Sequence, residues 1–229
     1  MMMDGEWAQK ADPVVAPGHS SAGSLERLLR RREFVVTAEL DPPDSAQAQD
    51  VYRRARIFDG YVDAINATDG SGANCHMSSL AVCALLTRAG YSPVMQISCR
   101  DKNRLAIQGD ILGGAAMGVT NMLCLSGDGV QLGDHPQAKP VFDLDCMSLL
   151  QTGRRMRDEQ MFQSGRRLSS APKVFFGAAA NPSALPFDLQ AQQLVKKIAA
   201  GAQFIQTQYC YDLPRLRQYM RCIEDLGLL

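Results

Sequence analysis

The sequence predicts an α/β protein of the (β/α)8 barrel type, with about six strand–helix units in this chain. Short apolar runs rich in β-branched residues alternate with longer segments of helical periodicity. A glycine precedes several of the strand runs, at Gly90, Gly118 and Gly201, where it commonly ends a helix. Polar residues follow the strand runs, as they do at the carboxyl ends of barrel strands. Together these patterns predict parallel strands joined by helices.

The amino-terminal part divides into a tail and a first unit. Residues 1–22 are rich in Ala, Pro, Gly and Ser and lack apolar periodicity, which predicts a flexible tail. The barrel domain is expected over 23–229. Ser24 opens an amphipathic run that predicts a short helix. The β-rich run 34–40 predicts the first strand, which Pro42 and Pro43 end.

Five further strands follow from apolar runs bounded by turn residues, and each is preceded by a segment with helical periodicity. The predicted strands are 62–66, 94–98, 121–125, 174–178 and 204–208. The predicted helices after the first strand are 45–58, 75–89, 102–117, 144–163, 187–200 and 213–226. A barrel of this type closes with eight units, and a seventh strand is expected where the sequence stops. We therefore expect a barrel that is incomplete at its C-terminus: a fragment, a chain completed by a partner, or an open sheet.

Composition excludes several classes of function. The 229 residues carry 24 basic and 24 acidic side chains, so the chain has no net field to attract nucleic acid or anionic lipid. No apolar run is long enough to span a bilayer, and the first residues do not resemble a secretion signal. The seven cysteines contain no C-x-x-C pair, which is typical of a reducing cytosol. We expect a cytoplasmic protein without a metal site.

The last predicted strand ends in a cluster of amide and hydroxyl groups, Gln206, Thr207 and Gln208. Polar side chains at the end of a buried strand are costly unless they bind a partner, and barrels place their chemistry at such ends. The alternative is that these groups bond only to neighbouring loops.

Similar polar positions follow the other strands. Glu39 lies among apolar neighbours, which favour the neutral acid and suit a proton donor, although it could instead cap the next helix. Asp128 could hold N–H groups of a ligand or simply form an Asp-Gly turn. The remaining candidates are a hydroxyl in a glycine-rich loop, polar groups of the third strand, and a small-residue run with an amide at its edge that leaves room for a flat ring: Thr68, Gln96, Ser98, Gly177 and Asn181.

Four motifs in this order resemble those of the methylenetetrahydrofolate reductases. They are Glu39 followed by Pro42-Pro43, Thr68 two residues before Gly70, Leu125-Ser-Gly-Asp128, and Leu194-Val-Lys-Lys-Ile-Ala-Ala-Gly-Ala-Gln-Phe-Ile-Gln-Thr-Gln-Tyr-Cys-Tyr-Asp212. The resemblance covers about residues 34–226 and is greatest to the short, single-domain bacterial-type branch. It implies a (β/α)8 barrel that binds flavin adenine dinucleotide (FAD). It also implies reduction of 5,10-methylenetetrahydrofolate to 5-methyltetrahydrofolate by hydride transfer from NAD(P)H through the flavin.

The resemblance also assigns roles to residues. Glu39 would be the acid that helps to open the methylene bridge, Asp128 would lie near the flavin ring and the pterin, and Gln208 would bind folate or nicotinamide in turn. The flavin cradle would include Thr68, Gln96, Ser98, Asp128, Gly177, Asn181, Lys197 and Ala202. Many family members have histidine at the position of Gln96, and tyrosine and histidine after the fifth strand, where this chain has Gly177 and Asn181.

Two other functions stay open on the sequence. One is a non-catalytic folate-binding partner subunit or inactive truncated relative, which would keep the barrel and part of the pterin pocket. The other is a barrel enzyme acting on a phosphorylated substrate, which would have a phosphate loop after strands seven and eight. The choice between NADH and NADPH is not determined by the sequence, nor is the choice between a homo-oligomer and a partner subunit.

Overall fold

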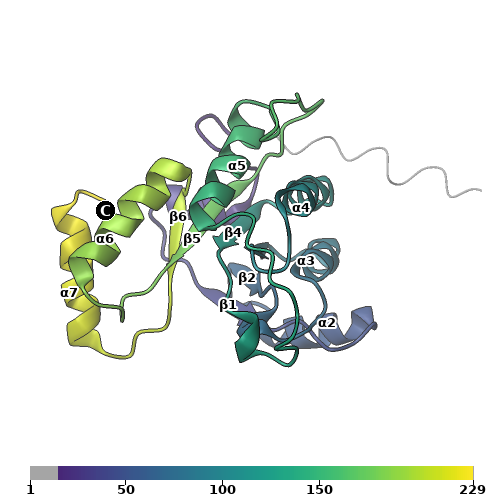
Figure 1. Ribbon diagram of the computed structural model, residues 1–229, viewed down its shortest axis with the longest axis horizontal. Helices are drawn as coiled ribbons and strands as arrows, with labels where there is room; N and C mark the ends of the chain where they lie inside the picture. The colour runs from purple at the N-terminus through teal and green to yellow at the C-terminus, as the bar shows by residue number, and fades with distance from the viewer. Residues whose placement is uncertain (1–14, 229) are drawn as a thin grey trace, which may run out of the picture.

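A computed structural model of the chain describes residues 15–228. Within them, six parallel strands form a single sheet whose spatial order is the chain order, β1 to β6. The strands are β1 (Thr37–Leu40), β2 (Ala64–Ala67), β3 (Pro93–Ser98), β4 (Asn121–Leu125), β5 (Phe175–Ala180) and β6 (Phe204–Thr207). The sheet curls into part of a barrel with the helices outside it (Figure 1). The predicted (β/α) barrel fold, with six units in this chain, is confirmed.

Seven α-helices and three short 3-10 turns connect and flank these strands in the described residues. The helices are α1 (Ser24–Arg30), α2 (Ala48–Ala55), α3 (Ser79–Arg88), α4 (Arg104–Ala116), α5 (Cys146–Asp158), α6 (Phe187–Ala200) and α7 (Leu213–Asp225). The turns are η1 (Arg56–Phe58), η2 (Ser71–Ala73) and η3 (Val130–Leu132). In this part of the chain, every helix falls short of the length and apolarity that crossing a bilayer would need.

The predicted elements all form, but several of their ends lie elsewhere. The first strand begins at Thr37 rather than at Phe34, because pairing with β2 starts there and the Phe34 side chain is 91% exposed. The third helix begins at Ser79, after Ser78 caps it by accepting a hydrogen bond from the backbone of Ala81. The helix expected over 144–163 ends at Asp158, and Gln160 then takes a left-handed φ of 54°.

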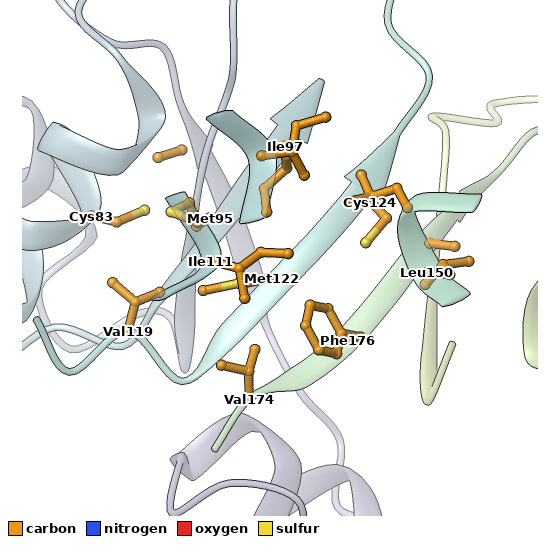
Figure 2. Close-up of a cluster of buried hydrophobic side chains, with 14 of the residues drawn as sticks. Cys83, Met95, Ile97, Ile111, Val119, Met122, Cys124, Leu150, Val174 and Phe176 are labelled. Carbon is orange, nitrogen blue, oxygen red and sulfur yellow. The ribbon is translucent and has the colours of Figure 1, made fainter. Parts of the chain in front are cut away.

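Alternation along the strands gives the sheet two faces. Outward-pointing residues pack against the helices and form the main apolar core. Figure 2 shows part of this layer, with residues of β3, β4 and β5 facing helical side chains: Met95, Met122, Phe176, Cys83, Ile111 and Leu150. The inward-pointing residues Ala64, Val94 and Leu123 form a smaller apolar cluster with Leu25 of α1. Toward the carboxyl ends of the strands, the inner face is polar.

The last residues of the expected tail belong to the folded body. Residues 1–14 lie outside the described residues, but the backbone N–H groups of Ser20 and Ser21 donate to the Glu26 carboxylate at 2.8 and 2.7 Å. Arg30 forms an ion pair with the same carboxylate at 2.8 Å. Glu26 is fully buried, and these donors satisfy it. The Ser20 hydroxyl also accepts a hydrogen bond from the Gln203 side chain, which ties this segment to the start of β6.

We expect Glu26→Gln to lower the free energy of unfolding at pH 7 by about 1.5–3 kcal/mol, because the hydrogen bonds to a charged acceptor are lost. Burial raises the pKa of Glu26, but the Ser20, Arg30 and Ser21 hydrogen bonds together lower it below the ordinary 4.5. The stabilisation is therefore present above pH 4.5 and is lost as the pH falls through the folded-state pKa. Urea unfolding at pH 7 and pH 3 measures this. An equal loss at both pH values would contradict the assignment.

Candidate functional site

A cavity of about 620 Å³ lies at the carboxyl ends of the strands, inside the curl of the sheet. Side chains of all six strands or of the loops that follow them line it. Three predicted catalytic residues from distant parts of the sequence, Glu39, Asp128 and Gln208, meet here. The predicted cofactor residues Thr68, Gln96 and Ser98 line the same cavity. Parallel strands bring these residues together because their carboxyl ends share one edge of the sheet.

Glu39 lies at the end of β1 on the inner face. The Gln96 Nε2 of β3 donates to Glu39 Oε2 at 3.3 Å. Burial raises the pKa of Glu39, the Gln96 hydrogen bond opposes this, and the negative charge of Asp41 adds to it, so that the net pKa is raised above 4.5. Glu39 therefore keeps its proton to a higher pH than an isolated glutamate, as a proton donor requires.

An ionic network holds the wall of the cavity that is formed by the loops after β2 and β3. Asp69 accepts from the backbone N–H of Ser98 at 2.9 Å and pairs with Lys102 at 3.0 Å. The buried Arg100 donates to the carbonyl of Gly70 at 3.1 Å and makes two hydrogen bonds to Asp101. These contacts connect the loop after β2 to the loop after β3. They fix the backbone next to Thr68, whose hydroxyl faces Asp41 at 3.4 Å.

A second space of about 680 Å³ adjoins the cavity and shares Asp128, Ala179, Gln208 and Tyr209 with it. Asn181 and Lys197, two predicted cofactor residues, line this second space. The Lys197 ammonium donates to the carbonyl of Ala179 at 2.6 Å, and the Asn181 side chain accepts from the backbone of Ser183 at 2.9 Å.

Two predicted cofactor residues lie away from both spaces. Gly177 is on the inner face of β5, but a Cβ there would be 2.3 Å from the Phe204 ring, so that ring fills the room the glycine leaves. Phe204 stacks on Phe175, with ring centroids 5.0 Å apart. Ala202 lies before the amino end of β6 and packs in the main core. Neither Gly177 nor Ala202 is among the residues that line the two spaces.

Two further residues that line the cavity, Asn66 and Tyr209, are not among the site residues predicted from the sequence. Asn66 is 1% exposed. Tyr209 follows β6 and lines the same cavity as Glu39, and the negative charge of Glu39, then burial, raises the pKa of the Tyr209 hydroxyl. Period-two alternation along β2 would have placed Asn66 on the same face as Thr68, and this was the available signal.

We expect Gly127→Ala to destabilise the fold by about 1–3 kcal/mol and to weaken ligand binding at the cavity. Gly127 has φ +93°, and a Cβ there would lie 2.2 Å from Ser98 Oγ and 2.9 Å from Arg100 Cβ, so the turn that carries Asp128 must move. Gly165→Ala is the matched control, because it has φ +89° and open space around it. Thermal unfolding of both variants measures the difference. Equal effects would show that the Ser98 and Arg100 contacts are unimportant.

A solved structure has the same type of fold. An uncharacterized protein from Clostridium thermocellum, described as binding two copies of 5-methyl-5,6,7,8-tetrahydrofolic acid, is similar with a TM-score of 0.60 at 10% sequence identity. The match covers 90% of this chain and 66% of that chain, so this chain spans slightly less than two thirds of its neighbour. The apo homocysteine methyltransferase MmuM from Escherichia coli is 12% identical over 87% of this chain and 98% of that chain, but its TM-score of 0.29 is too low to indicate a shared fold.

No curated protein matches the chain in sequence. The model of the methylenetetrahydrofolate reductase family, in contrast, matches residues 24–228. This match covers all six strands and all seven helices of the described part, together with the residues of the cavity. It agrees with the resemblance carried by the four sequence motifs. The chain therefore belongs to the methylenetetrahydrofolate reductase family.

Proposed function

We propose that this chain binds a reduced folate in the cavity and reduces 5,10-methylenetetrahydrofolate to 5-methyltetrahydrofolate, with NAD(P)H as electron donor and FAD as relay. The observation that carries the proposal is that Glu39, Asp128 and Gln208 line one cavity. Family membership supports a folate-related reductase. The bound methyltetrahydrofolate of the Clostridium thermocellum protein supports a folate ligand on this type of barrel.

The residues at the two adjoining spaces are compatible with a flavin dinucleotide. The first space offers neutral polar groups for the edge of a ring, from Thr68, Gln96 and Ser98. The second offers a cation for a diphosphate, since the Lys197 ammonium has one protein acceptor and retains further donor hydrogens. Ala179 lines both spaces and leaves room between them. Gly177 and Ala202 would contribute through packing rather than by contact.

The proposed chemistry divides the work between cofactor and protein. When bound, FAD would accept a hydride from the nicotinamide and supply it to the one-carbon unit. Glu39 would give its proton to N10 of the substrate as the bond between N10 and the methylene carbon breaks, while the N5 lone pair forms the iminium. Glu39 is left as a carboxylate, and water at its exposed side restores the proton. Asp128 and Gln208 would orient the pterin.

The visible spectrum of the purified protein tests this function. We expect a bound flavin absorbance that bleaches with NADH or NADPH and returns when 5,10-methylenetetrahydrofolate is added. A protein that remains colourless after incubation with FAD would contradict the reductase proposal. Equilibrium binding of 5-methyltetrahydrofolate by that colourless protein would then identify a non-catalytic folate-binding subunit.

A further inference from the structure

The buried amide of Asn66 has an oxygen without a hydrogen-bond donor. Asn66 is 1% exposed, lies in the middle of β2 and lines the cavity. Its Oδ1 has no partner among the described residues. A buried polar atom left without a partner is unfavourable, so an unpaired oxygen at a cavity points to a role in the site.

The neighbour of Asn66 on β1 is Glu39. The two residues are direct partners in the parallel pairing of β1 and β2, and both line the cavity, so their side chains share the inner face on strands about 4.8 Å apart. One oxygen of Glu39 already accepts a hydrogen bond from Gln96. The other oxygen, Oε1, has no hydrogen bond from the described residues and is free to carry a proton.

We propose that Asn66 is a positioning residue that holds Glu39 in its protonated form, with Asn66 Oδ1 accepting the hydrogen bond from the Glu39 O–H. The carboxylic acid and its neighbours are then complementary, because Gln96 donates to the carbonyl oxygen and Asn66 accepts from the hydroxyl. A carboxylate cannot donate, so only the protonated acid satisfies Asn66 Oδ1. The inference rests on the proposed role of Glu39 as the acid.

Other titratable and charged groups near Glu39 also influence its protonation. Asp41 follows β1 and opposes ionisation of Glu39. Tyr209 follows β6 and lines the same cavity, and the negative charge of Glu39 acts on it. The remaining charges that line the cavity are Asp128, Asp69, which pairs with Lys102, and Arg100, which pairs with Asp101. None of these groups supplies a donor to Asn66 Oδ1.

The test is a titration of the Glu39 carboxyl by carbon-13 NMR in the full chain, with the resonance assigned from its absence in Glu39→Gln. We expect Asn66→Ala to lower the pKa of Glu39, because the acceptor for the protonated form is lost. We expect Asn66→Asp, which is close in shape, to raise it, because a second carboxylate opposes ionisation. At a pH above the pKa of Glu39, we expect Asn66→Ala to carry out the folate half-reaction about tenfold more slowly than the native chain, because one hydrogen bond to the protonated acid is lost.

Asn121→Ala is the matched control. Asn121 is buried, its Oδ1 also lacks a partner, and it lies deeper in the sheet without lining the cavity. We expect the pKa of Glu39 to be unchanged in this variant. An unchanged pKa in both Asn66 variants, or a similar shift in Asn121→Ala, would overturn the inference. If Asn66→Ala does not fold, the Asn66→Asp variant decides. A pKa of Glu39 in that variant at or below its value in the native chain would overturn the inference.

The NMR measurement needs neither flavin nor turnover, so it separates this inference from the proposed function. A native chain that shows no flavin reduction or folate-dependent reoxidation contradicts the reductase proposal, whatever the Asn66 variants do. A native chain that is active, with a Glu39 pKa insensitive to Asn66, contradicts only the pairing proposed here.

Discussion

Glu39→Gln is expected to slow reoxidation of the reduced flavin by 5,10-methylenetetrahydrofolate by about 10²–10⁴-fold, the usual contribution of a positioned general acid. Reduction of the flavin by NAD(P)H should change by less than about threefold, because that half-reaction needs no proton from this carboxyl. Glutamine keeps the size of the side chain and can still contact Gln96, but it carries no acidic proton. Stopped-flow absorbance of the two half-reactions measures both rates.

The pH dependence adds a second readout for the same residue. The pKa of Glu39 is raised, so the fraction of protein able to donate the proton falls only as the pH passes above the range of an ordinary glutamate. We expect the folate half-reaction of the native chain to decline on that alkaline limb, and we expect the limb to be absent from the residual rate of Glu39→Gln. Glu33→Gln, an exposed glutamate at the opposite end of the first unit, is the control. Equal loss of both half-reactions in Glu39→Gln would place the acid elsewhere.

Phe176→Ala is expected to lower the free energy of unfolding by about 3–5 kcal/mol. Phe176 is completely buried on the outer face of β5, in the layer between the sheet and the helices (Figure 2). Its ring lies against Gly153 of α5, where a Cβ would be 2.6 Å from Phe176 Cζ. The Arg157 guanidinium lies over the Phe176 ring, 5.7 Å from the ring centroid. Removing the ring leaves a cavity that this close packing cannot readily fill.

Chemical denaturation of the native chain and the variant measures this loss. Phe34→Ala is the matched control, because the Phe34 side chain is 91% exposed and we expect its removal to change the stability by less than about 0.5 kcal/mol. A domain is commonly stable by only about 5–15 kcal/mol, so Phe176→Ala should also unfold at a clearly lower temperature. Similar effects of the two substitutions would contradict the assigned core.

The order and type of the strands and helices could be predicted from the sequence because they depend on local signals. Apolar runs, helical periodicity and glycines such as Gly201 indicate where elements begin and end, and each predicted strand and helix forms. The errors lie at element ends. Phe34 has high β-propensity, but no strand of residues 15–228 pairs with it, and hydrogen-bond pairing rather than propensity defines a strand.

The order of the barrel units, the family motifs and the residue types at the strand ends can be read along the chain. Which of those residues share a space depends on how the strands pack together. Glu39, Asp128 and Gln208 meet because their strands are parallel, whereas Gly177 lies beneath Phe204 and Ala202 lies at the opposite end of β6. The orphaned oxygen of Asn66 is visible only once β1 and β2 are paired. Contacts between strands are non-local, and no pattern along one segment specifies what another segment places beside it.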